Sequence, residues 1–150
     1  MVLLIIKILF KNFFNAGLQV IPKKNALEKI CLALENNDAV AFVLDQHAHI
    51  KNKDGIVVDF FGKPAGTYRA LAMIAQYTKA PVIPTNCYRR SDGKHVLEFL
   101  PPLPWLKGND EIYINTLQYN QSLEKLICAH PEQWLWIHRR WKINPNSSGM

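Results

Sequence analysis

The stretch that says most about the fold is Pro131-Glu132-Gln133-Trp134-Leu135-Trp136-Ile137-His138-Arg139-Arg140-Trp141-Lys142. It combines three tryptophans with two arginines, a histidine and a lysine. Indole rings of this number need a core or a membrane–water boundary, because each ring is apolar over most of its surface and polar at one atom. Proline is common at the first position of a helix, so we predict a helix that starts at Pro131. Trp134, Ile137 and Trp141 would then share one face, which we expect to pack against the rest of the fold.

The polar residues of this stretch have their own expected positions. Trp136 and Arg140 would lie one helical turn apart on a neighbouring face, where a guanidinium can stack on an indole. His138, Arg139 and Lys142 would point toward solvent or toward an anionic ligand. Burial is therefore the expected role of Trp134 and Trp141, and ligand binding that of the exposed cations.

The composition is that of one globular domain with an excess of positive charge. The chain has 150 residues, of which 49% are hydrophobic and 20% charged, enough for a real core in a single domain. A net charge of +6 favours an anionic partner, and a phospholipid surface, a phosphorylated substrate, an acidic protein and nucleic acid all remain open. The three cysteines, Cys31, Cys87 and Cys128, form no C-x-x-C pair. This spacing predicts neither a zinc site nor a disulfide framework, and it favours a reducing compartment.

Residues 1–14 are apolar and basic but do not have the pattern of a membrane span. Lys7 interrupts the apolar run after six residues, whereas a spanning helix needs about 20 apolar residues. A signal peptide would place its charge before the apolar run and small residues after it. We therefore predict an amphipathic helix whose apolar face packs on the rest of the protein, with a lipid surface as the alternative.

Strand and helix patterns alternate along the remainder of the chain. The Asp92-Gly93 pair is a strong hairpin signal. Alternation of this kind predicts an α/β fold with a mostly parallel sheet flanked by helices and one antiparallel hairpin, within a single domain, residues 1–150. The predicted strands are 18–21, 39–44, 56–61, 82–88 and 95–100, and the predicted internal helices are 26–34, 66–79 and 109–130.

Polar residues at the ends of two predicted strands are the first candidates for a site. Asp45 and Gln46 follow the continuous apolar run 39–44, and sites in α/β folds are usually built at the carboxyl ends of strands. Arg89 and Arg90 follow the strand 82–88, on the same side if the two strands are parallel. The arginine fork suits phosphate, although a solvated basic turn is an equally plausible interpretation. The sequence has no serine-hydrolase elbow and no glycine-rich phosphate loop.

The histidines after Asp45 give two weaker signals. His47 and His49 alternate as metal ligands on a strand do, but no third ligand follows at a recognisable spacing, so we expect a solvated loop and no metal. His49 and Asp54 spell His-x4-Asp, a motif in which acyltransferases use histidine as a general base. With five histidines and 12 acidic residues in the chain, such a match arises by chance roughly one time in three. We therefore expect His49 to be an ordinary loop residue.

From about Leu18 to Lys142 the chain resembles the C-terminal half of the lipid A biosynthesis (lauroyl/myristoyl) acyltransferase family. The matching features come in the family's order, and the terminal tryptophan motif is the most specific of them. They are Asp45-Gln46 after a buried strand, the Val-x-Phe-Phe-Gly-x-Pro-Ala-x-Thr run from Val58 to Thr67, Ala80-Pro81-Val82-Ile83-Pro84, Arg89-Arg90 before Asp92-Gly93, and the ending from Pro131 to Lys142.

The resemblance implies a partial glycerolipid-acyltransferase-like fold and a defined chemistry. Such proteins transfer a fatty acyl chain from acyl carrier protein to a hydroxyl of a phosphorylated, sugar-containing lipid, at the cytoplasmic face of the inner membrane. It implies a peripheral location for this chain, no cofactor and no nucleic-acid partner. Asp45 would be the catalytic residue. The acceptor would be bound by Gln46, Thr67, Arg89, Arg90, Arg139 and Arg140.

The resemblance also implies that part of the family's machinery lies elsewhere. The family's His-x4-Asp/Glu base belongs to a region upstream of the Asp-Gln strand that this chain does not contain. We therefore expect a fragment, a truncated gene product or one part of a split protein, poorly soluble or self-associating when alone. The alternative function is a non-catalytic basic module that binds anionic lipid or nucleic acid.

Overall fold

The computed structural model describes residues 15–22, 24–50 and 54–142, which divide into two units at residue 40. In the first unit, α2 (Ala26–Glu35) confirms the helix predicted over 26–34 and buries Ile30. It ends where Asn37 takes the left-handed conformation and the Asp38 N–H donates to the Ala33 carbonyl. The expected strand 18–21 is wrong, since these residues form no ladder. The helix expected over 1–14 lies outside the described residues.

The second unit begins its regular structure with a tight antiparallel hairpin. β1 (Gly55–Phe60) confirms the predicted strand 56–61 and pairs with β2 (Lys63–Tyr68). Phe61 and Gly62 connect them, both with positive φ (54° and 71°), as the two-residue turn that matches strand twist requires. The Gly62 N–H donates to Asp59 Oδ1 (2.9 Å) and fixes the turn. The Phe-Phe-Gly run is therefore a hairpin turn in this structure.

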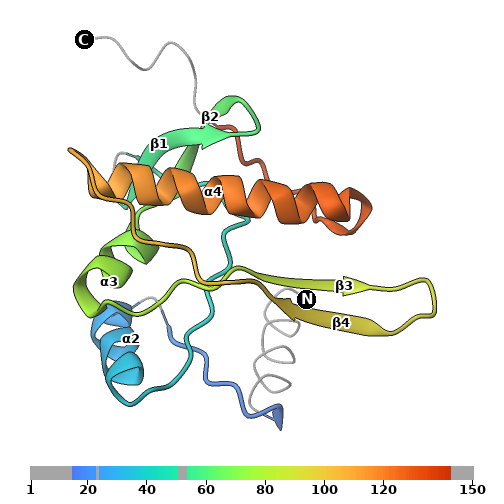
Figure 1. Ribbon diagram of the computed structural model, residues 1–150, viewed down its shortest axis with the longest axis horizontal. Coiled ribbons are helices and arrows are strands. Elements are labelled where there is room, and N and C mark those ends of the chain that lie inside the picture. The colour runs from blue at the N-terminus through green and yellow to red at the C-terminus, as the bar shows by residue number, and fades with distance from the viewer. Residues whose placement is uncertain (1–14, 23, 51–53, 143–150) are drawn as a thin grey trace. The chain divides into compact units, whose positions relative to one another are not determined.

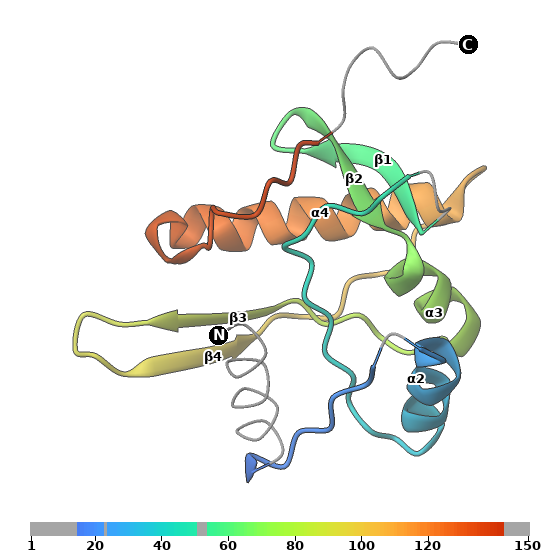
Figure 2. The ribbon, with the colours of Figure 1, turned by 180° about the vertical axis from the view of Figure 1, so that it is seen from behind.

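The remaining elements surround one long helix (Figures 1 and 2). Figure 1 shows α4 (Glu111–Ala129) with β1 and β2 on one side and a second antiparallel hairpin, β3 (Thr85–Arg89) and β4 (His95–Phe99), on the other. This hairpin and α4 confirm the predictions over 82–100 and 109–130. α3 (Ala70–Thr78) starts four residues after the predicted Gly66, because Gly66 and its neighbours are paired in β2.

The core of this unit lies between the first hairpin and α4. Phe60, Ala65 and Ile127 are buried together. Phe61, Leu123 and Trp134 pack against them. Aromatic residues of the Phe-Phe-Gly run and of the terminal motif thus share one core, which explains why both runs are rich in large rings.

The predicted parallel sheet is wrong. Both sheets of the described residues are two-stranded and antiparallel, and no parallel pair occurs among them. Residues 39–44, the expected buried strand, belong to no ladder, and Val43 is 79% exposed. A strand covered on both faces needs neighbouring strands for its backbone groups, and none of the described strands pairs with this segment.

The predicted terminal helix is also wrong. Pro131–Gln133 form a single 3₁₀ turn, and Trp134 is already extended, with ψ 135°. Ile137 is 73% exposed, so the expected apolar face does not form. Specific side-chain bonds hold the segment instead: Trp136 Nε1 donates to the Pro131 carbonyl (2.8 Å) and Trp141 Nε1 to the Phe60 carbonyl (3.0 Å). None of the helices in the described part of the chain is both long and apolar enough to cross a bilayer.

Candidate functional site

A side-chain contact between Asp45 and His138 forms the centre of the candidate site. Asp45 Oδ2 lies 3.3 Å from His138 Nε2, and both side chains are partly exposed. A carboxylate next to an imidazole orients the ring, and such a pair can move a proton to or from a hydroxyl. The sequence singled out Asp45 and its position after an apolar run, whereas His138 was expected to face solvent or an anionic ligand.

Arg140 lies buried close to this pair, not on Trp136 as expected. Its exposed fraction is 3%, and its guanidinium carbon lies 4.9 Å from the centre of the Phe60 ring. Nη1 donates to the Gly66 carbonyl (2.6 Å), and Nη2 donates to Thr67 Oγ1 (3.1 Å) and Asn120 Oδ1 (3.3 Å). Burial lowers the pKa of Arg140, and the negative charge of Asp45 opposes that shift. The two residues are therefore coupled electrostatically.

Thr67 and Asn120 complete the network around the guanidinium. Asn120 Nδ2 donates to the Asp59 carbonyl (2.9 Å) and to Thr67 Oγ1 (3.1 Å). Both side chains are buried, so α4, β1, β2 and the terminal segment are held together through polar atoms. Thr67, expected to bind the acceptor, thus contacts Arg140 and Asn120 in this structure.

Gly66 has a steric requirement that the sequence did not reveal. Its carbonyl accepts from the Ala48 N–H (3.0 Å) as well as from Arg140. A Cβ at this position would overlap the Ala48 carbonyl oxygen and lie 2.6 Å from His47 Cε1. Only glycine allows the segment after Asp45 to lie this close to β2.

His47 is half-buried beside this strand, although a solvated loop was expected. Its Nδ1–H donates to the Arg140 carbonyl (3.3 Å), because a carbonyl can only accept. Burial lowers the pKa of His47, and the positive charges of His49, Lys142 and Arg140 lower it further, while the hydrogen bond opposes the shift. His49 itself is exposed, and its ring contacts that of His47 edge to face.

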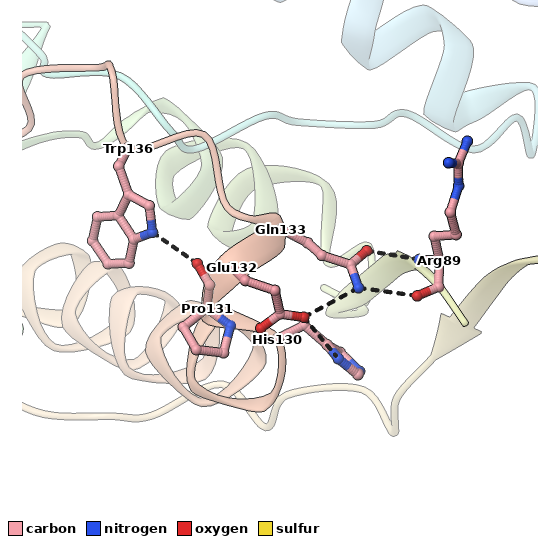
Figure 3. Close-up of polar contacts among 6 residues, drawn as sticks. All are labelled: Arg89, His130, Pro131, Glu132, Gln133 and Trp136. Atoms are coloured by element: carbon pink, nitrogen blue, oxygen red, sulfur yellow. Dashed lines mark hydrogen bonds and ion pairs between the residues drawn. The ribbon is translucent and has the colours of Figure 1, made fainter. Parts of the chain in front are cut away.

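The Arg89-Arg90 pair lies in the second hairpin, which is on the opposite side of α4 from β1 and β2 (Figure 1). Gln133 holds the Arg89 backbone with two bonds: its Oε1 accepts from the Arg89 N–H (2.7 Å), and its Nε2 donates to the Arg89 carbonyl (3.0 Å; Figure 3). Arg90 contacts Asp92 at 3.6 Å. The expectation that these arginines share a side with Asp45 depended on parallel strands, and the residues from 15 to 142 that the structure describes form none.

The Gln133 contact gives the first half of the terminal motif a structural role. Figure 3 shows Gln133 extending from the 3₁₀ turn to β3, while Trp136 folds back onto Pro131. The rings of Tyr88 and His130 stack at 4.0 Å beside it. A shallow depression at this junction is lined by Cys87, Tyr88, Arg89, His95 and Gln133. It does not include Asp45 or His138, so we place the candidate site at the contact between these two side chains.

The structure therefore brings together some of the predicted site residues and leaves others apart. Asp45 contacts His138, and Arg140 contacts Thr67 and Asn120, whereas Gln46 and Arg139 are exposed. The only sequence signal for His138 was its place beside the Arg-Arg pair of the terminal motif. Among the residues that the structure describes, no cluster of three or more potential ligands could hold a metal ion.

Comparison with known proteins shows which family this sequence matches. Residues 12–143 match the family model described as bacterial lipid A biosynthesis acyltransferase. The lipid A biosynthesis lauroyltransferase of Escherichia coli is 31% identical over 122 residues, covering 79% of this chain and 39% of that protein. The phosphatidylinositol mannoside acyltransferase of Mycobacterium tuberculosis is 26% identical over 138 residues, covering 89% and 42% respectively. The chain thus spans about two fifths of the length of these curated relatives.

Proposed function

The chain belongs to the bacterial lipid A biosynthesis acyltransferase family, and from this we propose that it forms the Asp45 side of an acyltransferase site for phosphorylated glycolipids. The observation that carries the proposal is the Asp45–His138 pair at 3.3 Å beside the buried Arg140, all inside the region that matches the family. The transferred group would be a fatty acyl chain, with acyl carrier protein as the donor. The acceptor would be a hydroxyl of a lipid A precursor.

The geometry supports a specific division of labour in this reaction. The Asp45 carboxylate holds the imidazole of His138 in place. We propose that this pair acts as the base that takes the proton from the acceptor hydroxyl. As the hydroxyl oxygen attacks the thioester carbonyl, its proton passes to the base, and the carrier thiol leaves with a proton. The positive charge of Arg140 attracts the Asp45 carboxylate, while hydrogen bonds of its own anchor Arg140 to β2.

The acceptor is proposed to carry phosphate, since the terminal segment 131–142 contains exposed cations. Arg139 and Lys142 flank Arg140 and are both exposed, so they are available to phosphate in a way that Arg140 is not. Arg89, Arg90 and Gln46 stay candidates for acceptor contacts. Two of the relatives are named for lipid A and for phosphatidylinositol mannoside, and both classes of acceptor contain sugar and phosphate. We propose the cytoplasmic face of the inner membrane as the place of the reaction.

The proposal is tested in membranes of an Escherichia coli strain that lacks its own lauroyltransferase and co-expresses this chain with the part of that enzyme that lies outside the match. Mass spectrometry of the extracted glycolipids should show an added acyl chain with the wild-type chain and none with Asp45→Asn. Asp38→Asn, at an exposed position just after α2, is the matched control and should behave as wild type. Glycolipid binding without acylation would favour the non-catalytic alternative, and unchanged acylation by Asp45→Asn would refute the role of Asp45.

A further inference from the structure

The segment 41–44, immediately before Asp45, has the character of a strand without a partner. Its sequence is Ala41-Phe42-Val43-Leu44, apolar throughout and with valine and phenylalanine, which favour strands. Exposure alternates along it, with Phe42 and Leu44 partly covered and Ala41 and Val43 exposed, as in a strand with one face inward. No ladder of the described residues includes it.

A second apolar surface occurs in the same unit, on one face of the β3–β4 hairpin. Cys87 pairs with Leu97, and Thr85 with Phe99, so these four side chains share a face. All four are exposed, Leu97 at 60% and Phe99 at 66%. A two-stranded hairpin with a bare apolar face is marginal in water, which indicates that this face is covered in the working protein.

We propose that the segment 41–44 binds an added β-strand, supplied by the part of the acyltransferase fold that the relatives have and this chain does not span. This inference rests on the proposed function. The relatives are more than twice as long as the stretch they share with this chain, so a large part of their polypeptide is available to cover both surfaces. The added strand would end next to Asp45 and bring groups of that polypeptide to the site.

A polypeptide fits this segment better than the other occupants do. Among the described residues, no backbone group bonds to the N–H and C=O groups of 41–44. These groups need hydrogen-bonding partners, and a lipid chain offers none, whereas a strand offers them at the right spacing. A second copy of this chain would supply only the same two fifths of the relatives' sequence, so the remaining part of their fold would still be missing. The occupant is therefore the complementary part of the fold.

The test is to co-express this chain with the part of the Escherichia coli lauroyltransferase that lies outside the match, and separately with the corresponding part of the Mycobacterium tuberculosis relative. Size-exclusion chromatography with light scattering should show a one-to-one complex with at least one of them. Val43→Lys places a charge at an exposed position, so the isolated chain should fold unchanged while the affinity falls at least tenfold. Tyr77→Lys, at the equally exposed Tyr77 (78%) on α3, is the matched control and should bind as wild type.

Several results would overturn the inference. One is the absence of a complex with either partner. Another is binding by Val43→Lys that equals binding by the wild-type chain. A third is that Val43→Lys abolishes the formation of a homodimer or the binding of anionic vesicles, and not the binding of either partner. Acyl transfer is measured separately, so the two proposals fail independently. A complex that forms through Val43 but transfers nothing retains the surface and refutes the function. Acyl transfer that Val43→Lys does not reduce would retain the proposed function and refute the proposed binding surface.

Discussion

Arg140→Ala should destabilise the protein strongly, whereas Arg139→Ala, one residue earlier, should not. Arg140 donates three hydrogen bonds from a buried charged group, and each such bond contributes about 1.5–3 kcal/mol. The loss should be smaller than their sum, because Gly66 O keeps the Ala48 N–H and Thr67 Oγ1 keeps Asn120 Nδ2. Asn120 Oδ1 is left without its partner.

The expected cost for Arg140→Ala is therefore about 3–5 kcal/mol, as for the removal of one partner from other buried charged networks. Arg139 is exposed, so its replacement should change the free energy of unfolding by no more than about 0.5 kcal/mol.

Urea unfolding followed by tryptophan fluorescence measures both variants directly, since the chain has four tryptophans. For a protein of this size, about 3–5 kcal/mol corresponds to a fall in Tm of about 10 °C. Arg140→Lys keeps the charge but not the planar fork, and it should recover only part of the loss. If Arg140→Ala and Arg139→Ala unfolded within about 1 kcal/mol of each other, the buried network would not be the support of the site.

Three further predictions follow from single contacts. Because burial lowers the pKa of His47 below 6.5 in the folded state, the unfolded chain binds a proton first as the pH falls, so His47 contributes stability above pH 6.5 that is lost at lower pH. His47→Gln should therefore reduce the loss of unfolding free energy between pH 7.5 and 5.5. His49→Gln removes only one of the smaller causes of the lowered His47 pKa, so it should reduce that loss by less, and an effect as large as that of His47→Gln would contradict the role of burial. Gly66→Ala should lower the free energy of unfolding in urea by about 1–3 kcal/mol or more, because the added Cβ overlaps the Ala48 carbonyl. Gly108→Ala should cost less, because a Cβ there would meet only the tip of the Ile114 side chain. Equal costs would contradict the close approach at Gly66. Gln133→Leu should speed hydrogen exchange of the Arg89 amide and its β3 neighbours while changing the global unfolding free energy by about 1–2 kcal/mol, and an unchanged exchange rate would show that the two bonds to Arg89 do not hold the hairpin.

The parts of the fold that the sequence predicted well are those that local interactions determine. The Asp92-Gly93 turn was enough to predict the β3–β4 hairpin, and helical periodicity was enough for α2 and α4. The terminal motif behaved differently. Its helical spacing was real, but bonds from Gln133, Trp136, Arg140 and Trp141 hold most of it in a non-helical conformation. Side-chain partners distant in sequence outweighed the local pattern.

The candidate site shows the same limit more clearly. Asp45 was predicted because a strand-like run ends there, which is a local signal. The contacts of Arg140 with Gly66 and Thr67 join residues 74 and 73 positions apart, and the Asp45–His138 pair likewise joins two distant segments. No spacing rule within one chain predicts such pairs. The prediction of a parallel sheet failed for a related reason. Residues 39–44 have the composition of a buried strand, but a strand forms only where another strand supplies its hydrogen bonds.

The central claim is that Asp45, paired with His138, serves acyl transfer to a phosphorylated glycolipid. The most direct measurement is transfer of a labelled acyl chain from acyl carrier protein to a lipid A precursor by the purified complex of this chain with the complementary part of the Escherichia coli lauroyltransferase. We predict labelled glycolipid with the wild-type complex and with Asp38→Asn, and a loss of at least a hundredfold in rate with Asp45→Asn, since general acid–base groups contribute about 10²–10⁴-fold. Equal rates for Asp45→Asn and wild type, or no transfer by an intact complex, would contradict the account.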